Sequence, residues 1–239
     1  HRDKLRRGLV FGFWVGHETG TMIGSSRFAD HNWDRLRRDA VAYLQIDQPG
    51  CLGTTCWQTM SNPELRRFHE TIEARTLPDI ERRWSRAMKV GDSSFFGMGI
   101  PMFAGQGAYT RDELDGTANA SFGWWHHSVE NTIDKVEWNF LDAHMRTYVA
   151  YLWALCTSPL LPMEFVSVAD EISARLAELA SVPSGIELAT ATALAAELRK
   201  AAGKLDGIAG KLAAEVAAGA DAEAQVVIVN RCLKKLSRL

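Results

Sequence analysis

The chain has 239 residues, of which 46% are hydrophobic and 23% are charged, and its formal net charge is −2. This is the composition of an ordinary globular protein, long enough for one large domain with an appendage. The near-neutral charge provides neither a basic surface for nucleic acid nor an acidic tail. No apolar run approaches the roughly 20 residues of a membrane span. We therefore expect a soluble protein that binds neither nucleic acid nor membrane.

The chain opens on a charged segment, residues 1–7, without an initiator methionine or a secretory pattern. It runs at once into an apolar segment, residues 8–15, which the pattern predicts to be a strand buried on both faces. We expect such a start in the middle of a longer protein. The sequence itself assigns no compartment.

Predicted strands and helices alternate up to residue 160. Residues 19–32 are expected to form a helix, and residues 40–46 a strand that ends before Pro49. Asn62 and Pro63 are typical of a helix start, as its cap and its first residue. The alternation predicts an α/β protein.

Two further elements complete this part of the chain. Residues 95–103 contain a short apolar strand, and residues 134–156 are expected to form a long helix. The apolar face predicted for that helix comprises Val136, Phe140, Leu141, Val149 and Leu152.

After Pro162 the chain becomes rich in Ala, Leu, Glu and Lys. Breaks at residues 183–185 and 219–221 predict three helices. Heptad-like apolar positions favour a helical hairpin packed on the domain or on a second subunit: Ile186, Leu194, Leu198, Leu205, Ile208 and Leu212. We therefore divide the chain into residues 1–160 and a helical extension, residues 161–239, which is a candidate oligomerisation element.

Four cysteines are present. Their spacing does not fit a zinc ribbon, and a local bridge between Cys51 and Cys56 stays open.

Ligand sites in such sheets form at the carboxyl ends of strands. His17 and Glu18 follow the first predicted strand and Asp47 follows the second. His126 and His127 follow two tryptophans, and in extended chain only one of two neighbouring side chains can face a given site. Each has a structural alternative: Glu18 as a helix-start carboxylate, Asp47 as a turn residue and His127 as part of an aromatic cluster.

Three segments together resemble the zinc-dependent aminopeptidase and glutamate-carboxypeptidase-like metallopeptidase family: residues 14–20 with Gly24 and Ser25, residues 45–47 and residues 125–136. A fourth, residues 91–101, is similar to the family's aspartate-bearing approach to the substrate pocket. The resemblance covers residues 1–156. It implies a three-layer α/β/α sandwich with a mostly parallel mixed sheet, incomplete in this chain.

The resemblance also implies a pair of divalent metal ions, usually zinc. It assigns Glu18 and His127 to one ion and Asp47 to the other. His17 stands where the family has its general base, a glutamate, so we expect His17 to accept the proton. The family's remaining ligands lie upstream of residue 8, and an N-terminal segment or a partner subunit is expected to supply them.

The implied substrate is a peptide or a small amide. The candidate substrate-binding residues are Asp92, Phe95, Phe96, Trp124, Trp125 and His126. Core packing is the alternative for the aromatic ones. Tyr109, Arg111 and Asp115 are expected in a long loop, and His31, His69 and His144 receive no role.

Three functions stay open. The leading hypothesis is a metal-dependent hydrolase of peptide or related amide bonds. The second is an amidohydrolase for a non-peptide small molecule, and the third is a non-catalytic structural or binding subunit.

Overall fold

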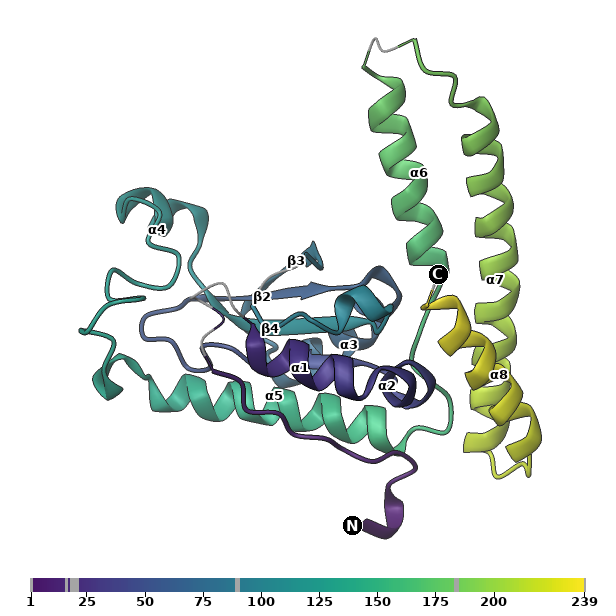
Figure 1. Ribbon diagram of the computed structural model, residues 1–239, viewed down its shortest axis with the longest axis horizontal. Helices are drawn as coiled ribbons and strands as arrows, with labels where there is room; N and C mark the ends of the chain where they lie inside the picture. Colours follow the sequence, from purple (N-terminus) through teal and green to yellow (C-terminus); the bar gives the residue numbers. More distant parts are fainter. Residues whose placement is uncertain (1, 16, 18–21, 89–90, 183–184, 239) are drawn as a thin grey trace.

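The structure is a computed structural model that describes residues 2–15, 17, 22–88, 91–182 and 185–238 (Figure 1). Its centre is a four-stranded sheet in the order β1-β4-β2-β3. The strands are β1 (Tyr43–Gln45), β2 (Cys56–Ser61), β3 (Glu81–Arg86) and β4 (Met102–Ala108). β1 pairs with β4 and β2 with β3 in parallel, whereas β2 and β4 are antiparallel. The predicted mixed, mostly parallel sheet is confirmed.

Helices cover both faces of this sheet. On one face, α1 (Ile23–His31) and α2 (Trp33–Asp39) enclose a small core with Tyr43 of β1. On the other, α3 (Arg66–Thr76) and α5 (Trp138–Thr157) enclose the main core with Leu44. Tyr43 and Leu44 serve opposite cores because successive strand residues point to opposite faces. The α/β/α layering is confirmed.

Several short elements connect these layers. They are η1 (Arg2–Lys4), η3 (Pro63–Leu65), η4 (Phe96–Met98), α4 (Arg111–Gly116) and η5 (Ile133–Lys135). Asn62 and Pro63 do open the helical turn that leads into α3, as predicted. The Asn62 side chain, however, accepts from the backbone N–H of Met102 at 3.0 Å, so it ties this turn to β4 instead of capping the helix.

The strand predicted at residues 8–15 is wrong. This segment is extended but belongs to no strand, and Phe13 and Val15 are 92% and 83% exposed. A strand needs a neighbour for its backbone hydrogen bonds, and within the described ranges no strand pairs with it. Trp14 alone turns inward, onto Phe28 and Phe95.

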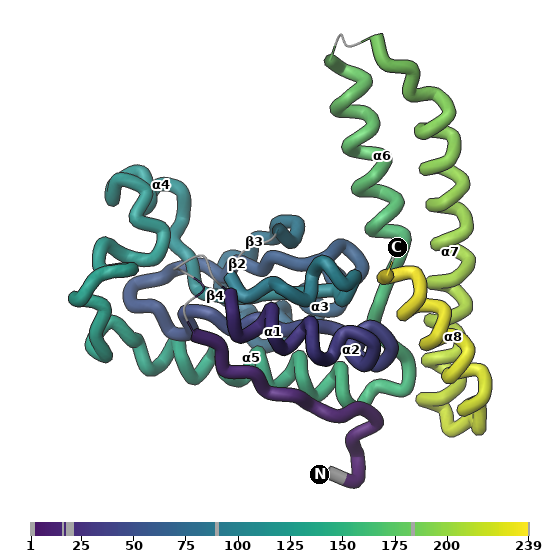
Figure 2. Tube along the Cα trace, viewed as in Figure 1, coloured from purple at the N-terminus to yellow at the C-terminus, as the bar shows by residue number. Residues whose placement is uncertain are grey.

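Arg7 anchors this N-terminal segment to the end of α5. Its guanidinium donates to the carbonyls of Leu155, Ser158 and Pro159 at 2.9, 2.6 and 3.0 Å. A cation satisfies the unpaired carbonyls and the negative end of the dipole at a helix C-terminus. In Figure 2 the chain runs from this anchor toward the start of α1.

The face of α5 that enters the core differs from the predicted one. Val149 is 59% exposed, and the buried side chains are His144, Thr147, Tyr148, Tyr151, Leu155 and Cys156. Several of these carry polar ends that are satisfied inside. The Tyr148 hydroxyl, for example, donates to the carbonyl of Gly105 at 2.7 Å. A count of apolar residues alone therefore misplaced the buried stripe.

The three predicted C-terminal helices are confirmed as α6 (Val166–Ala180), α7 (Ala189–Ala217) and α8 (Glu223–Leu236). Figure 1 shows α6 and α7 as a hairpin that projects beyond the sheet, with α8 folded back beside α7. Asp206 of α7 accepts from the backbone N–H groups of Phe165 and Val166, so α7 caps the start of α6.

All four cysteines are free, so the bridge left open between Cys51 and Cys56 does not form. Among the described residues, no helix combines the length and the apolar character needed to cross a membrane.

Candidate functional site

Several of the candidate residues follow β1 and β4 in the chain. These two strands are parallel, so both direct their following segments to the same edge of the sheet. Asp47 lies two residues beyond β1. β4 leads through α4 into the segment that carries Trp124, Trp125, His126 and His127. Topology thus brings segments distant in sequence to one edge.

His17 and Asp92 form the clearest chemical pair at this edge. His17 Nδ1 lies 3.1 Å from Asp92 Oδ2, although 75 residues separate them. Asp92 is 94% buried, whereas the His17 side chain is about one quarter exposed. An imidazole that donates from Nδ1 to a carboxylate keeps Nε2 as its basic nitrogen. The pair therefore has the geometry of an oriented proton acceptor.

Serine hydroxyls hold the carboxylate of Asp92 from behind. Ser25 Oγ donates to Asp92 Oδ1 at 2.8 Å, and it lies 2.9 Å from Ser94 Oγ. Ser25 sits in the first turn of α1, fully buried. Ser25, Asp92 and His17 form a hydrogen-bonded row from the core to the surface. The sequence suggested Asp92 for substrate binding, and neither Ser25 nor Ser94 had an assigned role.

The segments that carry Asp47 and His127 are in contact through residues next to these two. Gln48 Nε2 lies 3.2 Å from Nδ1 and 3.3 Å from Nε2 of His126. Behind this contact, Leu52 donates to the carbonyl of Lys135, and Glu137 donates to that of Gly50. The segment after β1 is thus hydrogen-bonded to the segment that carries both histidines and to the residues that follow it.

The backbone is strained in both segments that meet at this contact. Gln48 and His127 adopt positive φ angles of 50° and 62°, which are uncommon for residues other than glycine. The His126 and His127 rings stack with centroids 3.7 Å apart, and His127 is exposed. Gly50 at the same turn has φ +72°, and a Cβ there would lie 2.8 Å from Leu141 Cβ. The turn that carries Asp47 therefore depends on glycine at position 50.

His144 fixes this turn from inside. Its Nδ1 accepts from the backbone N–H of Gly50 at 3.0 Å, and its ring packs 4.7 Å from that of Trp57. Burial lowers the pKa of His144 from 6.5 to about 4, because a charged imidazole loses its hydration there. Sequence analysis assigned no role to this histidine, whereas in the structure it supports the turn that carries Asp47.

Acid should weaken the fold through His144. The unfolded chain protonates this ring near pH 6.5 and the folded one near pH 4, so the stabilising effect is complete above pH 6.5 and declines below it. We expect the free energy of unfolding to fall by about 2–3 kcal/mol between pH 7 and 4.5 from this residue. Urea unfolding at the two pH values should show a smaller fall in the free energy of unfolding for His144→Gln than for wild type. His31→Gln, which changes an exposed histidine of α1, should show the same fall as wild type. An unchanged fall in His144→Gln would contradict this assignment.

The aromatic candidates are divided by the structure. Phe95 is buried against Tyr43 at 4.8 Å and belongs to the core under α1. Phe96 is half-buried in η4. Trp124 is 68% exposed and meets Trp125 edge-on, while the Lys135 ammonium lies over the Trp125 ring at 5.8 Å.

Residues expected in a loop are partly helical. Arg111 and Asp115 belong to α4 and form an ion pair at 2.9 Å. Tyr109 donates its hydroxyl to the carbonyl of Leu52 at 2.6 Å, so it braces the turn after β1. Thr110 and Glu113 form a complete capping box that starts α4.

A metal site is not complete within the part of the chain described. Glu18 lies outside the described residues, and among the described ones no three His, Cys, Asp or Glu side chains converge. Asp47 and His127 are thus candidate ligands for which the described residues provide no third partner.

A second polar cluster lies under α3, away from this edge. Ser61 Oγ is 3.0 Å from His69 Nε2, and His69 Nδ1 is 2.9 Å from Glu73 Oε1. The order resembles a nucleophile, base and orienting acid, but all three side chains are buried. Trp84 of β3 donates its indole N–H to Ser61 Oγ and covers it. The cluster is a structural network.

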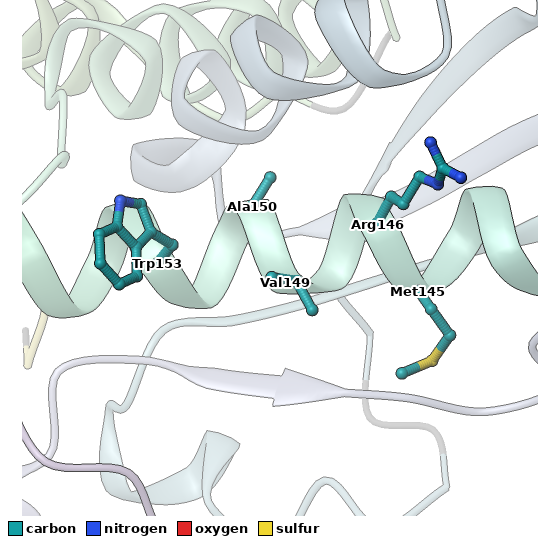
Figure 3. Close-up of a pocket in the computed structure, with 5 residues that line it drawn as sticks. All are labelled: Met145, Arg146, Val149, Ala150 and Trp153. Carbon is teal, nitrogen blue, oxygen red and sulfur yellow. The ribbon is translucent and has the colours of Figure 1, made fainter. Parts of the chain in front are cut away.

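A shallow hollow lies on the outer side of α5 (Figure 3). Its lining residues are Met145, Arg146, Val149, Ala150 and Trp153. None of the candidate site residues lines it.

No protein-family model matches the sequence, and no curated protein does. Parts of solved structures are similar. LapA of Legionella pneumophila shares 14% identity over 61% of this chain and 39% of its own, with a TM-score of 0.48; a second LapA aminopeptidase structure gives the same identity and score. The aminopeptidase of Aneurinibacillus sp. strain AM-1 shares 17% identity over 60% of this chain and 32% of its own, with a TM-score of 0.44. The chain spans less than two fifths of these proteins.

Proposed function

We propose that this protein hydrolyses amide bonds, with His17 as the group that moves the proton. The observation that supports this most is the row formed by Ser25, Asp92 and His17 at the carboxyl edge of the sheet. The buried carboxylate fixes the ring, which is partly exposed and lies near the end of β1, at the edge where such sheets bind ligands. A general base that is both oriented and accessible fits hydrolysis better than a purely structural role.

The reaction requires one proton acceptor that can also donate. Water loses a proton to Nε2 of His17 as its oxygen bonds to the amide carbon. The C–N bond then breaks, and the same proton passes from Nε2 to the leaving nitrogen. One amide and one water thus give one carboxylic acid and one amine, and His17 returns to its initial state. Asp92 stabilises the charged ring in between.

A divalent metal pair, zinc first, is part of the proposal. Glu18, Asp47 and His127 are the residues of this chain that would hold it, since carboxylate and imidazole suit zinc. Metal ions in such a centre polarise the carbonyl and acidify water. Two ions need more ligands than these three, so we propose that an N-terminal segment or a partner chain supplies the rest.

The proposed substrate is a peptide or a small amide, with Trp124 and Trp125 as candidate walls of its binding site. A panel of aminoacyl, acylated and aromatic amides tests this directly. Cleavage of aminoacyl amides supports a peptidase, and cleavage of aromatic or acylated amides alone supports an amidohydrolase for small molecules. Absence of any cleavage by the metal-loaded protein, assayed together with the segment or partner chain that supplies the remaining ligands, would refute the proposal and favour a non-catalytic binding subunit.

Replacing His127 by alanine should remove metal. If its imidazole is a ligand, elemental analysis should show at least a tenfold weaker retention of zinc or manganese after dialysis. His31→Ala, on the exposed face of α1, is the matched control and should retain metal as wild type does. Equal metal content in both variants would exclude His127 as a ligand.

A further inference from the structure

Gln45 ends β1 with a buried side-chain amide. The residue is 92% buried, and no described residue donates a hydrogen bond to its Oε1. An acceptor shut away from water without a donor destabilises a fold, whereas an apolar side chain of the same size would not. An unpaired buried acceptor needs a donor, and at the edge where such sheets bind ligands a bound molecule can supply one.

Gly91 makes room for this amide beside the His17 pair. A Cβ at position 91 would overlap Gln45 Nε2 and would lie 3.6 Å from His17 Nε2. Gly91 also has φ +53°, which disfavours any other residue. The next residue along the chain is Asp92, the partner of His17. The Gln45 amide and His17 Nε2 therefore both lie close to Gly91.

We propose that Gln45 Oε1 accepts the N–H of the scissile amide and so selects secondary over tertiary amides. The inference rests on the proposed function and names its substrate class. The Gln45 amide lies close to Gly91, as His17 Nε2 does, and in the proposed reaction His17 delivers its proton to the leaving nitrogen. When its N–H points to Gln45, the nitrogen can turn its developing lone pair toward His17. A tertiary amide has no such hydrogen and leaves Oε1 unpaired.

Two small amides that differ by one methyl group test this. The probes are phenylalanine methylamide, which has the N–H, and phenylalanine dimethylamide, which does not. We expect Gln45→Met to lower kcat/KM for the methylamide about tenfold and to leave that for the dimethylamide unchanged, as loss of one hydrogen bond requires. Gly91→Ala, which displaces the amide, should change the same ratio in the same direction.

The affinity of both probes, measured by calorimetry, tests the role of Gln45 independently of turnover. Wild type should bind the methylamide more tightly than the dimethylamide, and Gln45→Met should bind both equally. This binding result would support the role of Gln45 even if neither probe is cleaved. Absence of cleavage would count against the proposed hydrolase activity and not against the role of Gln45. Gln106→Met, on β4, is the control and should keep the wild-type preference. The role of Gln45 is overturned if Gln45→Met keeps the wild-type ratio or weakens both probes equally.

Stability gives an independent readout. Met has nearly the volume of Gln and no unpaired acceptor, so Gln45→Met should unfold at the same or a higher temperature than wild type. A lower unfolding temperature would mean that Gln45 serves the fold, which contradicts the proposal.

Discussion

Replacing Glu73 by alanine should lower the free energy of unfolding by about 3–5 kcal/mol. Glu73 Oε1 accepts from Thr59 at 2.6 Å, from His69 at 2.9 Å and from Tyr151 at 2.6 Å. These donors come from β2, α3 and α5, so one carboxylate oxygen joins three elements of the main core. Alanine would leave three buried donors without an acceptor.

The charge of Glu73 is retained in spite of its burial. Burial alone would raise the pKa of this carboxyl, but the hydrogen bond and charge of His69, with the hydrogen bonds of Thr59 and Tyr151, hold it below its ordinary value. The carboxylate is therefore ionised at neutral pH, and its stabilising effect is lost as acid protonates it.

Glu70→Ala is the matched control for this prediction. Glu70 lies on the same helix and pairs with Arg66 at 2.7 Å on the exposed surface. Its removal should cost at most about 0.5 kcal/mol. Denaturant unfolding of both variants measures the difference. Should Glu73→Ala prove too unstable to purify, Tyr151→Phe removes one donor and should cost about 1 kcal/mol. A Glu73→Ala protein within 1 kcal/mol of wild type would contradict the network.

Replacing His17 by alanine should lower kcat by about 10²–10⁴-fold, the usual contribution of a general base. Its side chain is partly exposed, so the fold should change little. Bound metal should stay at the wild-type level, because His17 is proposed to carry the proton and not the ion. Steady-state hydrolysis and elemental analysis on the same preparation measure both quantities.

His31→Ala again provides the comparison. This histidine is exposed on α1, where its Nδ1 contacts the carbonyl of Arg27. We expect unchanged kcat. A fully active His17→Ala enzyme would remove His17 from the mechanism.

The main elements of the fold could be predicted where apolar periodicity or turn chemistry was strong. Asn62 and Pro63 marked the start of the turn before α3, and the Ala-rich C-terminal part gave its three helices. β2 and β3 were missed because their inward residues include Thr59, Ser61 and Trp84, whose polar atoms are satisfied in the buried network. Such a strand has no alternation of apolar and polar residues from which it could be predicted.

The site was predictable in its parts but not in its contacts. Strand ends and motif resemblance identified His17, Asp47, Asp92 and His127 as candidates. Spacing could not show that Asp92 reaches back to His17, because that contact depends on how the loop before β4 folds over the end of β1. Gln45 did carry a signal, as a polar residue at the end of an apolar strand.

The most direct test of the His17 and Asp92 unit is kcat for the double variant His17→Ala/Asp92→Ala, compared with each single variant. If Asp92 acts through His17, Asp92→Ala should cost about 10–10³-fold in wild type and no more than about threefold once His17 is gone. If Asp92 instead contacts the substrate by itself, the two losses should multiply. Multiplying losses would contradict the oriented base on which the proposed function rests.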